Sequence, residues 1–228
     1  MKISGFEKLT LLDYPGKVAC IIFTQGCNYK CKFCQNSSLI GIGNEEYKEQ
    51  EILDYLEKRK NILDGVVISG GEPTLCKGLK SFIKKVKELN LLVKLDTNGT
   101  NPQLLNELIS EKLIDYIAMD IKNTFACYEK IVDVKNPLIE RIKESIDIIK
   151  KSGLDHEFRT TIMKEHHNIK LLKEICEYIG KEEKYYIQNF RISDYVIDKT
   201  LTPFDETELL DIKEKLTKEF PNAYVRGI

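Results

Sequence analysis

The chain is organised around nine residues, Gly26-Cys27-Asn28-Tyr29-Lys30-Cys31-Lys32-Phe33-Cys34. Three of them are cysteines, separated by three residues and then by two. They follow the apolar run of residues 18–23, which predicts a buried strand, so the cysteines lie in the loop that leaves this strand. Three thiolates this close in sequence can hold one inorganic centre without ligands from distant parts of the chain. Residues 26–35 are therefore a candidate metal-binding loop.

The cysteine spacing restricts the kind of centre. A structural zinc site needs four tetrahedral ligands, usually as two separated pairs, and the histidines, His156, His166 and His167, all lie in the second half of the chain. A redox dithiol needs two cysteines rather than three. A cubic iron–sulfur cluster normally takes four thiolates, so three would leave one iron open to a substrate or cofactor, as in catalytic metal sites. Three free cysteines in a loop are the remaining alternative.

Length and composition disfavour several classes of function. The chain has 228 residues, a formal net charge of −1 and no long basic run, which disfavours nucleic acid as the main partner. No apolar stretch reaches the ~20 residues of a membrane span, and the first residues lack the apolar core of a signal peptide. Seven cysteines with three crowded together do not suggest a disulfide framework. We expect a cytoplasmic protein with a single domain over residues 1–228 that binds neither nucleic acid nor membranes.

Apolar periodicity predicts strands that alternate with helices. Strands are expected at residues 17–24, 65–69, 91–96, 116–121, 156–163 and 185–190, with a short last strand at 224–225. Helices are expected at residues 49–59, 78–89, from 101 onward, 136–153, around 171–179 and at 206–218. Residues 1–16 are expected to form a short N-terminal entry segment, in which Leu9, Leu11 and Tyr14 alternate with polar neighbours and Pro15-Gly16 turns into the first main strand. The alternation predicts a parallel sheet with right-handed crossovers, either open and doubly wound or curved into a partial barrel.

Polar clusters follow the expected strands at the end where parallel α/β folds bind ligands. They are Ser69-Gly70-Gly71-Glu72-Pro73, Asp96-Thr97-Asn98-Gly99, Asp120-Ile121-Lys122 and, on the fifth strand, Arg159. The two glycines would let the backbone approach a ligand closely because they lack a Cβ. The Glu72 carboxylate could accept hydrogen bonds from an ammonium group. Asp96, Asp120 and Lys122 could instead form ion pairs at the end of the sheet.

The cysteine loop resembles that of the radical S-adenosylmethionine enzymes. This resemblance implies a partial (β/α)6 barrel and one 4Fe–4S cluster bound by Cys27, Cys31 and Cys34, whose fourth iron chelates S-adenosylmethionine. Residues Gly70-Gly71-Glu72-Pro73 are similar to the family motif that holds the amino group of this cofactor. Phe33 occupies a position whose backbone commonly touches the adenine in the family.

Two further motifs, Asp96-Thr97-Asn98-Gly99 and Met119-Asp120-Ile121-Lys122, resemble one subfamily, the activases of glycyl-radical enzymes. The resemblance implies that these aspartates and Thr97 help to build a monovalent-cation site next to the cofactor carboxylate, and that Asn98 is a further candidate for binding S-adenosylmethionine. It also implies that Lys122 contacts the cofactor or substrate and that Arg159 lies near the cofactor. On the sixth strand the activase of pyruvate formate-lyase has a histidine that contacts the cofactor, and this chain has Gln188 and Asn189 as candidates to replace it.

The narrowest resemblance is to the anaerobic ribonucleoside-triphosphate reductase activating proteins. It rests on Leu9-Thr10-Leu11-Leu12-Asp13-Tyr14-Pro15-Gly16-Lys17 and on Phe23-Thr24-Gln25-Gly26-Cys27. The implied reaction is reductive cleavage of S-adenosylmethionine to methionine and a 5′-deoxyadenosyl radical, which takes a hydrogen from a glycine Cα of the reductase. The implied electron donor is a low-potential protein such as flavodoxin or ferredoxin, and no side chain need act as an acid or base.

Alternative functions remain open. One is activation of another glycyl-radical enzyme, and another is radical chemistry on a small molecule, as in a 7-carboxy-7-deazaguanine synthase. An iron–sulfur electron carrier or sensor would explain the cysteines but not residues 70–73 or the polar strand ends.

The remaining cysteines and histidines give weaker signals. Cys76 and Cys127 follow expected strands and could approach the site, whereas Cys20 and Cys176 are expected to be small buried residues. The adjacent pair at positions 166 and 167 is expected to open a helix at the surface.

Overall fold

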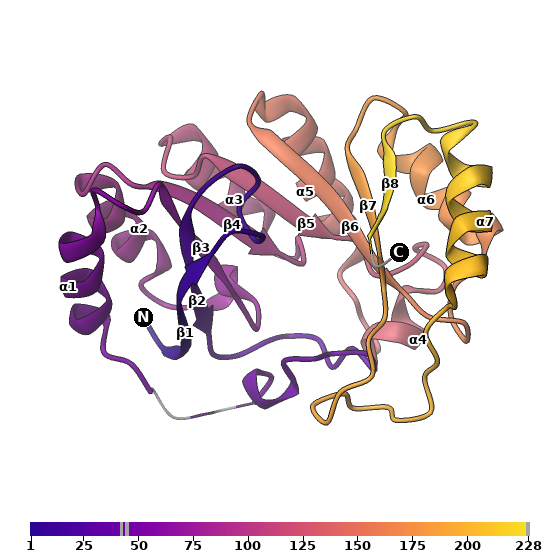
Figure 1. Ribbon diagram of the computed structural model, residues 1–228, viewed down its shortest axis with the longest axis horizontal. Coiled ribbons are helices and arrows are strands. Elements are labelled where there is room, and N and C mark those ends of the chain that lie inside the picture. The colour runs from indigo at the N-terminus through magenta and orange to yellow at the C-terminus, as the bar shows by residue number, and fades with distance from the viewer. Residues whose placement is uncertain (42, 44–45, 227–228) are drawn as a thin grey trace. The chain divides into compact units, whose positions relative to one another are not determined.

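The computed structural model describes residues 1–41, 43 and 46–226. Within these residues eight strands form one sheet in the order of the sequence (Figure 1). The strands are β1 (Ile3–Thr10), β2 (Ala19–Thr24), β3 (Gly65–Gly70), β4 (Leu92–Thr97), β5 (Tyr116–Asp120), β6 (Asp155–Ile162), β7 (Tyr185–Asn189) and β8 (Ala223–Arg226). The pairs β2–β3, β3–β4, β6–β7 and β7–β8 are parallel, and β1 is antiparallel to β2. The expected α/β class is confirmed.

The helices alternate with these strands as the periodicity predicts. They are α1 (Glu49–Arg59), α2 (Leu79–Glu88), α3 (Pro102–Ser110), α4 (Tyr128–Val132), α5 (Ile139–Ser152), α6 (Ile169–Ile179) and α7 (Glu206–Thr217). Short 3-10 turns lie at Ser37–Leu39 and Pro73–Leu75.

The chain divides into two compact units, which are described separately below. The first unit comprises Met1–Asn28, Ser38–Ala118 and Glu140–Asp155, and the second comprises Tyr29–Ser37, Met119–Ile139 and the chain from His156 onward. The single-domain extent of residues 1–228 stays a prediction.

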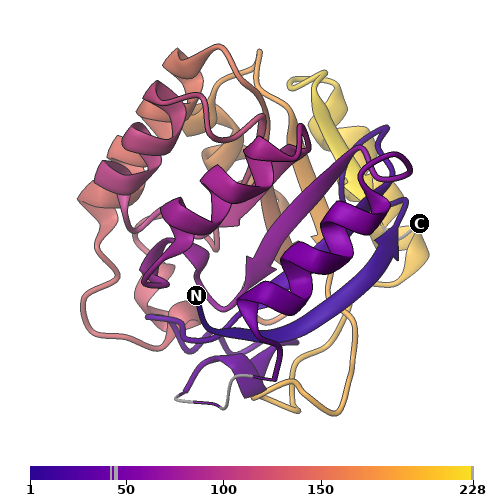
Figure 2. The same cartoon turned by 90° about the vertical axis from the view of Figure 1, so that its left-hand side faces the viewer.

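The first unit is built on β2 and β3, whose side chains are buried on both faces. Ala19 to Ile22 of β2 and Val66 to Ile68 of β3 are almost fully buried, as expected for parallel strands covered on both sides. Tyr14 and Tyr116 pack with Val67 in one apolar cluster. Helix α1 packs against α2, and α2 packs against β4 (Figure 2). These contacts fix the carboxyl ends of β3 and β4.

Two glycines at the end of β3 allow close contact with the start of the cysteine loop. A Cβ at Gly70 would lie 2.3 Å from the Thr24 nitrogen, and a Cβ at Gly71 would lie 2.2 Å from the Gly26 oxygen. The Glu72 N–H donates to this same oxygen at 2.8 Å. Because Gly70 and Gly71 lack side chains, their backbone can pack directly against the backbone of Thr24 and Gly26. This contact is separate from any contact with a ligand.

The second unit contains β6, β7 and β8, with α7 packed on β8 and on α6. The cysteine loop enters this unit at Tyr29 and is held by the segment around α4. The Lys30 N–H donates to the Val132 oxygen at 2.9 Å, and the Tyr29 hydroxyl donates to the Pro137 oxygen at 2.5 Å. The carbonyl groups of Val132 and Pro137 therefore hold the middle of the cysteine loop in place.

Within the expected entry segment of residues 1–16, residues 3–10 form β1. This edge strand is half-buried or exposed along most of its length and has two register shifts against β2, so its sequence lacks a clean period of two. The sequence also misses α4, which is too short for helical periodicity to be visible.

The ends of the other predicted elements agree closely with the structure. Helix α1 has the predicted bounds, and β8 confirms the short last strand. Helix α5 ends before Gly153, which has a φ of 72° and stops the helix as expected. It begins at Ile139 rather than at 136, because Leu138 has a left-handed φ of 56° and its N–H donates to the Asn136 side chain.

Candidate functional site

Glu72 is the centre of a buried hydrogen-bond network in the first unit. Only 1% of the residue is exposed. One carboxylate oxygen accepts from the Thr74 N–H at 3.0 Å, the Thr74 hydroxyl at 2.5 Å and the Thr97 hydroxyl at 2.8 Å, and the other accepts from the Asn98 N–H at 2.6 Å. Burial raises the pKa of Glu72, although these donors act to lower it. The carboxylate therefore joins the loop after β3 to the loop after β4.

The loop after β4 is also bonded to the start of the cysteine loop. The Asn98 amide donates to the Asn28 side-chain oxygen at 2.9 Å, and the Asn28 amide donates to the Thr100 hydroxyl at 3.0 Å. The Cys27 N–H donates to the Ile40 oxygen at 3.2 Å. The first cysteine and its neighbour are thus fixed by backbone and amide contacts on both sides.

Asp96 forms an ion pair with Lys94, a residue that the sequence analysis did not select. The Lys94 ammonium lies 2.6 Å from one carboxylate oxygen, and the Ser69 hydroxyl donates to the other at 3.0 Å. Lys94 is almost fully buried, and its ammonium lies 5.8 Å from the centre of the Tyr116 ring. A lysine two residues before an aspartate on one strand shares its face, which is the signal that could have identified this pair.

In the second unit Asp120 accepts from two cations. The Lys122 ammonium donates to one oxygen and the Arg159 guanidinium to the other, both at 2.9 Å. Burial acts to raise the pKa of Asp120, but the two cations outweigh it and hold the pKa well below its usual range. The structure therefore brings Asp120, Lys122 and Arg159 together as ion pairs, which is one of the two interpretations that the sequence allowed.

Phe33 and two of the three cysteines lie in the same unit as this ion pair. The Lys122 ammonium lies 5.6 Å from the centre of the Phe33 ring. The Cys34 N–H donates to the Cys31 oxygen at 2.9 Å, which closes a turn between the second and third cysteines. Burial raises the pKa of Cys34, while Lys122 acts to lower it. Lys122 therefore offsets the effect of burial only in part, and the pKa of the Cys34 thiol lies above its usual value.

The backbone of Lys122 is held from both sides by residues that the sequence analysis did not assign to the site. Its N–H donates to the Tyr128 hydroxyl at 3.1 Å, and its carbonyl lies 3.1 Å from Nε2 of His167. The expectation that His167 lies at the surface is wrong, since only 3% of it is exposed. The Met163 N–H donates to its Nδ1 at 3.4 Å, so Nε2 carries the proton and donates to the Lys122 carbonyl.

His167 is expected to make stability depend on pH between about 6.5 and 4. Burial lowers its pKa from 6.5 to about 4, so the unfolded chain binds a proton in this range and the folded chain does not. Stability then falls as the pH falls from 6.5 to 4, by about 3 kcal/mol, and is constant above that window. Urea unfolding of the wild type and of His167→Gln at several pH values measures this difference. An equal pH dependence in the two proteins would contradict it.

Gln188 and Asn189, the two candidates to replace the histidine of the pyruvate formate-lyase activase, lie on β7. The side chain of Asn189 is hydrogen-bonded within the protein. Its amide donates to the Phe204 oxygen at 2.8 Å, and its side-chain oxygen accepts from the Phe204 N–H at 3.1 Å. Gln188 therefore stays the better candidate for a cofactor contact. Cys76, whose sulfur lies 3.9 Å from the Lys2 oxygen, and Cys127, which precedes α4, have no demonstrated role in the site.

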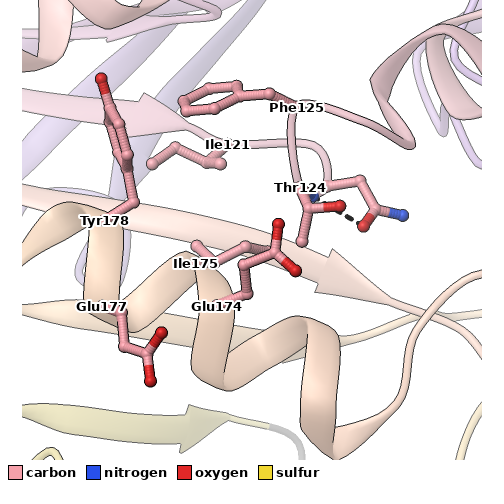
Figure 3. Close-up of a pocket in the computed structure, with 8 residues that line it drawn as sticks. Ile121, Thr124, Phe125, Glu174, Ile175, Glu177 and Tyr178 are labelled. Atoms are coloured by element: carbon pink, nitrogen blue, oxygen red, sulfur yellow. Dashed lines mark hydrogen bonds between the residues drawn. The ribbon is translucent and has the colours of Figure 1, made fainter.

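A cavity of about 340 Å³ lies in the second unit between the segment after β5 and α6 (Figure 3). Its walls are formed by Ile121, Asn123, Thr124, Phe125, Glu174, Ile175, Glu177 and Tyr178. The Phe125 and Tyr178 rings meet edge to face, 4.6 Å apart. Neighbouring side chains of an extended segment point to opposite sides, so this cavity lies on the side of Ile121 and away from Asp120 and Lys122.

Comparison with known families assigns the chain to the same superfamily that the cysteine loop resembles. The model of the Radical SAM superfamily matches residues 21–179. The chain belongs to the radical SAM superfamily. Membership makes the protein an enzyme of this type and implies one 4Fe–4S cluster and S-adenosylmethionine. No helix in the described residues has the length and apolar character needed to cross a membrane.

Relatives within the radical SAM superfamily cover nearly the whole chain. It is 34% identical to a candidate glycyl-radical enzyme activating enzyme of Methanocaldococcus jannaschii, over 99% of this chain and 96% of that protein. It is 28% identical to the pyruvate formate-lyase-activating enzyme of Clostridium pasteurianum, over 80% of this chain and 79% of that protein. The crystal structure of Streptococcus suis SuiB bound to the precursor peptide SuiA matches with a TM-score of 0.73 and 17% identity, over 91% of this chain and 48% of that one. This last likeness concerns the fold alone.

The donor set of the loop fits the cluster of a radical SAM enzyme. Among the described residues, Cys27, Cys31 and Cys34 form no disulfide bond, so each offers a thiol sulfur. Among the described residues no three His, Cys, Asp or Glu side chains converge on the position of a single metal ion, which is the geometry that structural zinc would need. Thiolates that bind separate irons of a cube need not converge in this way.

Proposed function

We propose that this protein is the activase of a glycyl-radical enzyme, and that its partner is the anaerobic ribonucleoside-triphosphate reductase. The observation that carries the proposal is the similarity over 99% of the chain to a candidate glycyl-radical enzyme activating enzyme, with the pyruvate formate-lyase-activating enzyme also matching most of the chain. The choice of partner is supported by the resemblance of residues 9–17 and 23–27 to the reductase activating proteins.

In this proposal the cysteine loop holds the cluster through Cys27, Cys31 and Cys34, and the loops after β3, β4 and β5 hold S-adenosylmethionine. When bound, these groups would supply one-electron reductive cleavage of S-adenosylmethionine, with the electron from a low-potential donor such as flavodoxin or ferredoxin. The products would be methionine and, after transfer of a hydrogen atom from a glycine Cα, 5′-deoxyadenosine and a glycyl radical. The protein supplies orientation and charge rather than an acid or a base.

The charges of the polar strand ends would orient the cofactor. Lys122 and Arg159 are fixed by Asp120, and Lys122 presents positive charge near Phe33. Lys94 supplies a positive charge beside Asp96, the carboxylate at which the resemblance implies a monovalent cation. The Thr97 hydroxyl donates to Glu72 rather than to an open position, and its role would be to hold the loop that touches the cofactor.

The test is anaerobic electron paramagnetic resonance. The protein is reconstituted with iron and sulfide, reduced, and mixed with S-adenosylmethionine and the anaerobic reductase encoded by the same genome. We expect 5′-deoxyadenosine and a glycyl doublet on the reductase, neither of which forms when S-adenosylmethionine is omitted. A doublet on a formate-lyase-type enzyme instead would retain the activase and change its partner. Absence of 5′-deoxyadenosine from cluster-loaded protein would refute the proposal.

A further inference from the structure

The segment that follows β7 exposes three large apolar side chains. Ile192 is 72% exposed, Tyr195 is 64% exposed and Ile197 is 47% exposed, all within six residues (the orange loop that follows β7 in Figure 1). Single exposed apolar residues are ordinary, whereas a group of them in one short segment indicates an interaction surface. We call these three side chains the apolar surface of the 191–199 loop.

Internal contacts hold this loop in one conformation. The Lys199 ammonium donates to the Ser193 oxygen at 2.9 Å and to the Asp194 oxygen at 2.6 Å. Val196 is buried, and its N–H donates to the Ser193 oxygen at 3.3 Å. The apolar surface is therefore preformed, which lowers the conformational entropy lost when a partner binds it.

Three hydrogen bonds attach the same loop to the cysteine loop. The Gln35 amide donates to the Arg191 oxygen at 3.0 Å, and the Asp198 N–H donates to the Lys32 oxygen at 2.9 Å. The Ser37 hydroxyl donates to the oxygen of Tyr195. These donors and acceptors surround Phe33 and Cys34 in the sequence. The backbone of the 191–199 loop, which carries the apolar surface, is thus bonded to residues on both sides of the last cysteine.

We propose that Ile192, Tyr195 and Ile197 form the docking surface for the protein substrate, an inference that rests on the proposed activase function. A glycine in another protein can reach the reacting atoms only if that protein binds beside the cysteine loop, and this surface is attached there. The loop carries Arg191 and Lys199 against Asp194 and Asp198, so it lacks the basic excess that attracts anionic lipid. Its side chains extend outward, as a protein contact requires.

The first test is a titration with the anaerobic reductase from the same genome. In the triple variant Ile192→Ser, Tyr195→Ser, Ile197→Ser, we expect the reductase concentration for half-maximal radical formation to rise at least about tenfold. Cleavage of S-adenosylmethionine by reduced protein without reductase should stay at the wild-type rate. The control is Leu210→Ser, which alters an exposed apolar residue on α7 that is as exposed as Ile197, at 47%. An unchanged titration in the triple variant would overturn the docking surface.

The second test reports contact independently of catalysis. A photo-crosslinking amino acid at position 195 should capture the reductase, and the same group at position 210 should not. Capture of a second copy of this chain in place of the reductase would overturn the assignment. If the wild type cleaves S-adenosylmethionine but forms no radical on any glycyl-radical enzyme, the proposed function fails. If the wild type forms the radical and the triple variant performs equally well, only the docking surface fails.

Discussion

Replacing Cys31 by alanine is expected to reduce cleavage of S-adenosylmethionine to less than about a hundredth of the wild-type rate. The loss of a group that merely supports a metal ligand costs about 10–100-fold, and Cys31 is proposed as a ligand itself. A cluster with two cysteine ligands would be lost or unstable during reconstitution. The measurements are bound iron and sulfide, the charge-transfer absorbance of the cluster, and 5′-deoxyadenosine formed by the reduced protein.

The matched control is Cys176→Ala. Both cysteines are buried, but Cys176 lies on α6 and packs as a small apolar residue. Its replacement should cost about 1 kcal/mol of unfolding free energy and leave iron content and cofactor cleavage unchanged. If Cys31→Ala kept a full cluster and the wild-type rate, the three-cysteine assignment would be wrong. If both variants lost the cluster equally, the effect would come from folding rather than from ligation.

The features that the sequence predicted are those encoded by neighbouring residues. The bounds of α1 follow from a helical period within eleven residues, and the stop of α5 follows from Gly153 alone. The cysteine loop is identified by spacing, and the polar strand ends are identified by position after each apolar run. Each of these signals is local, so no knowledge of long-range contacts is needed to find it.

The features that could not be predicted from the sequence depend on contacts between residues far apart in the chain. His167 stands beside another histidine before a helix, where a surface position is the usual assignment, and only its bonds to Lys122 and Met163 explain its burial. Tyr128 is one aromatic among many until its hydroxyl meets the backbone of Lys122. Neither contact has a sequence signal in a single chain.

Glu72 has a role in the structure that its motif did not predict. The sequence offered its carboxylate to a ligand, whereas the structure bonds it to donors from two loops of the same unit. The nearby Gly71 likewise meets the backbone of Gly26. A carboxylate that organises both loops would act on the cofactor through their backbone, and this distinction can be measured.

Replacing Glu72 by alanine is expected to lower the free energy of unfolding by about 2–6 kcal/mol. The N–H groups of Thr74 and Asn98 would each lose a buried acceptor, at a cost of about 1–3 kcal/mol apiece. The hydroxyls of Thr74 and Thr97 can rotate toward other acceptors, so they add less. Urea unfolding of the anaerobic apoprotein measures the loss.

Two further variants separate the roles of Glu72. Glu177→Ala removes an exposed carboxylate on α6 and should change stability by no more than about 0.5 kcal/mol. Glu72→Gln keeps the size and one acceptor but turns an amide N–H₂ toward the Asn98 N–H, so its loss of stability should fall between the other two. If the carboxylate works by organising the loops, the KM for S-adenosylmethionine should rise in step with the loss of stability across the Glu72 variants. A large rise in KM for Glu72→Gln with wild-type stability would show instead that the carboxylate binds the cofactor directly.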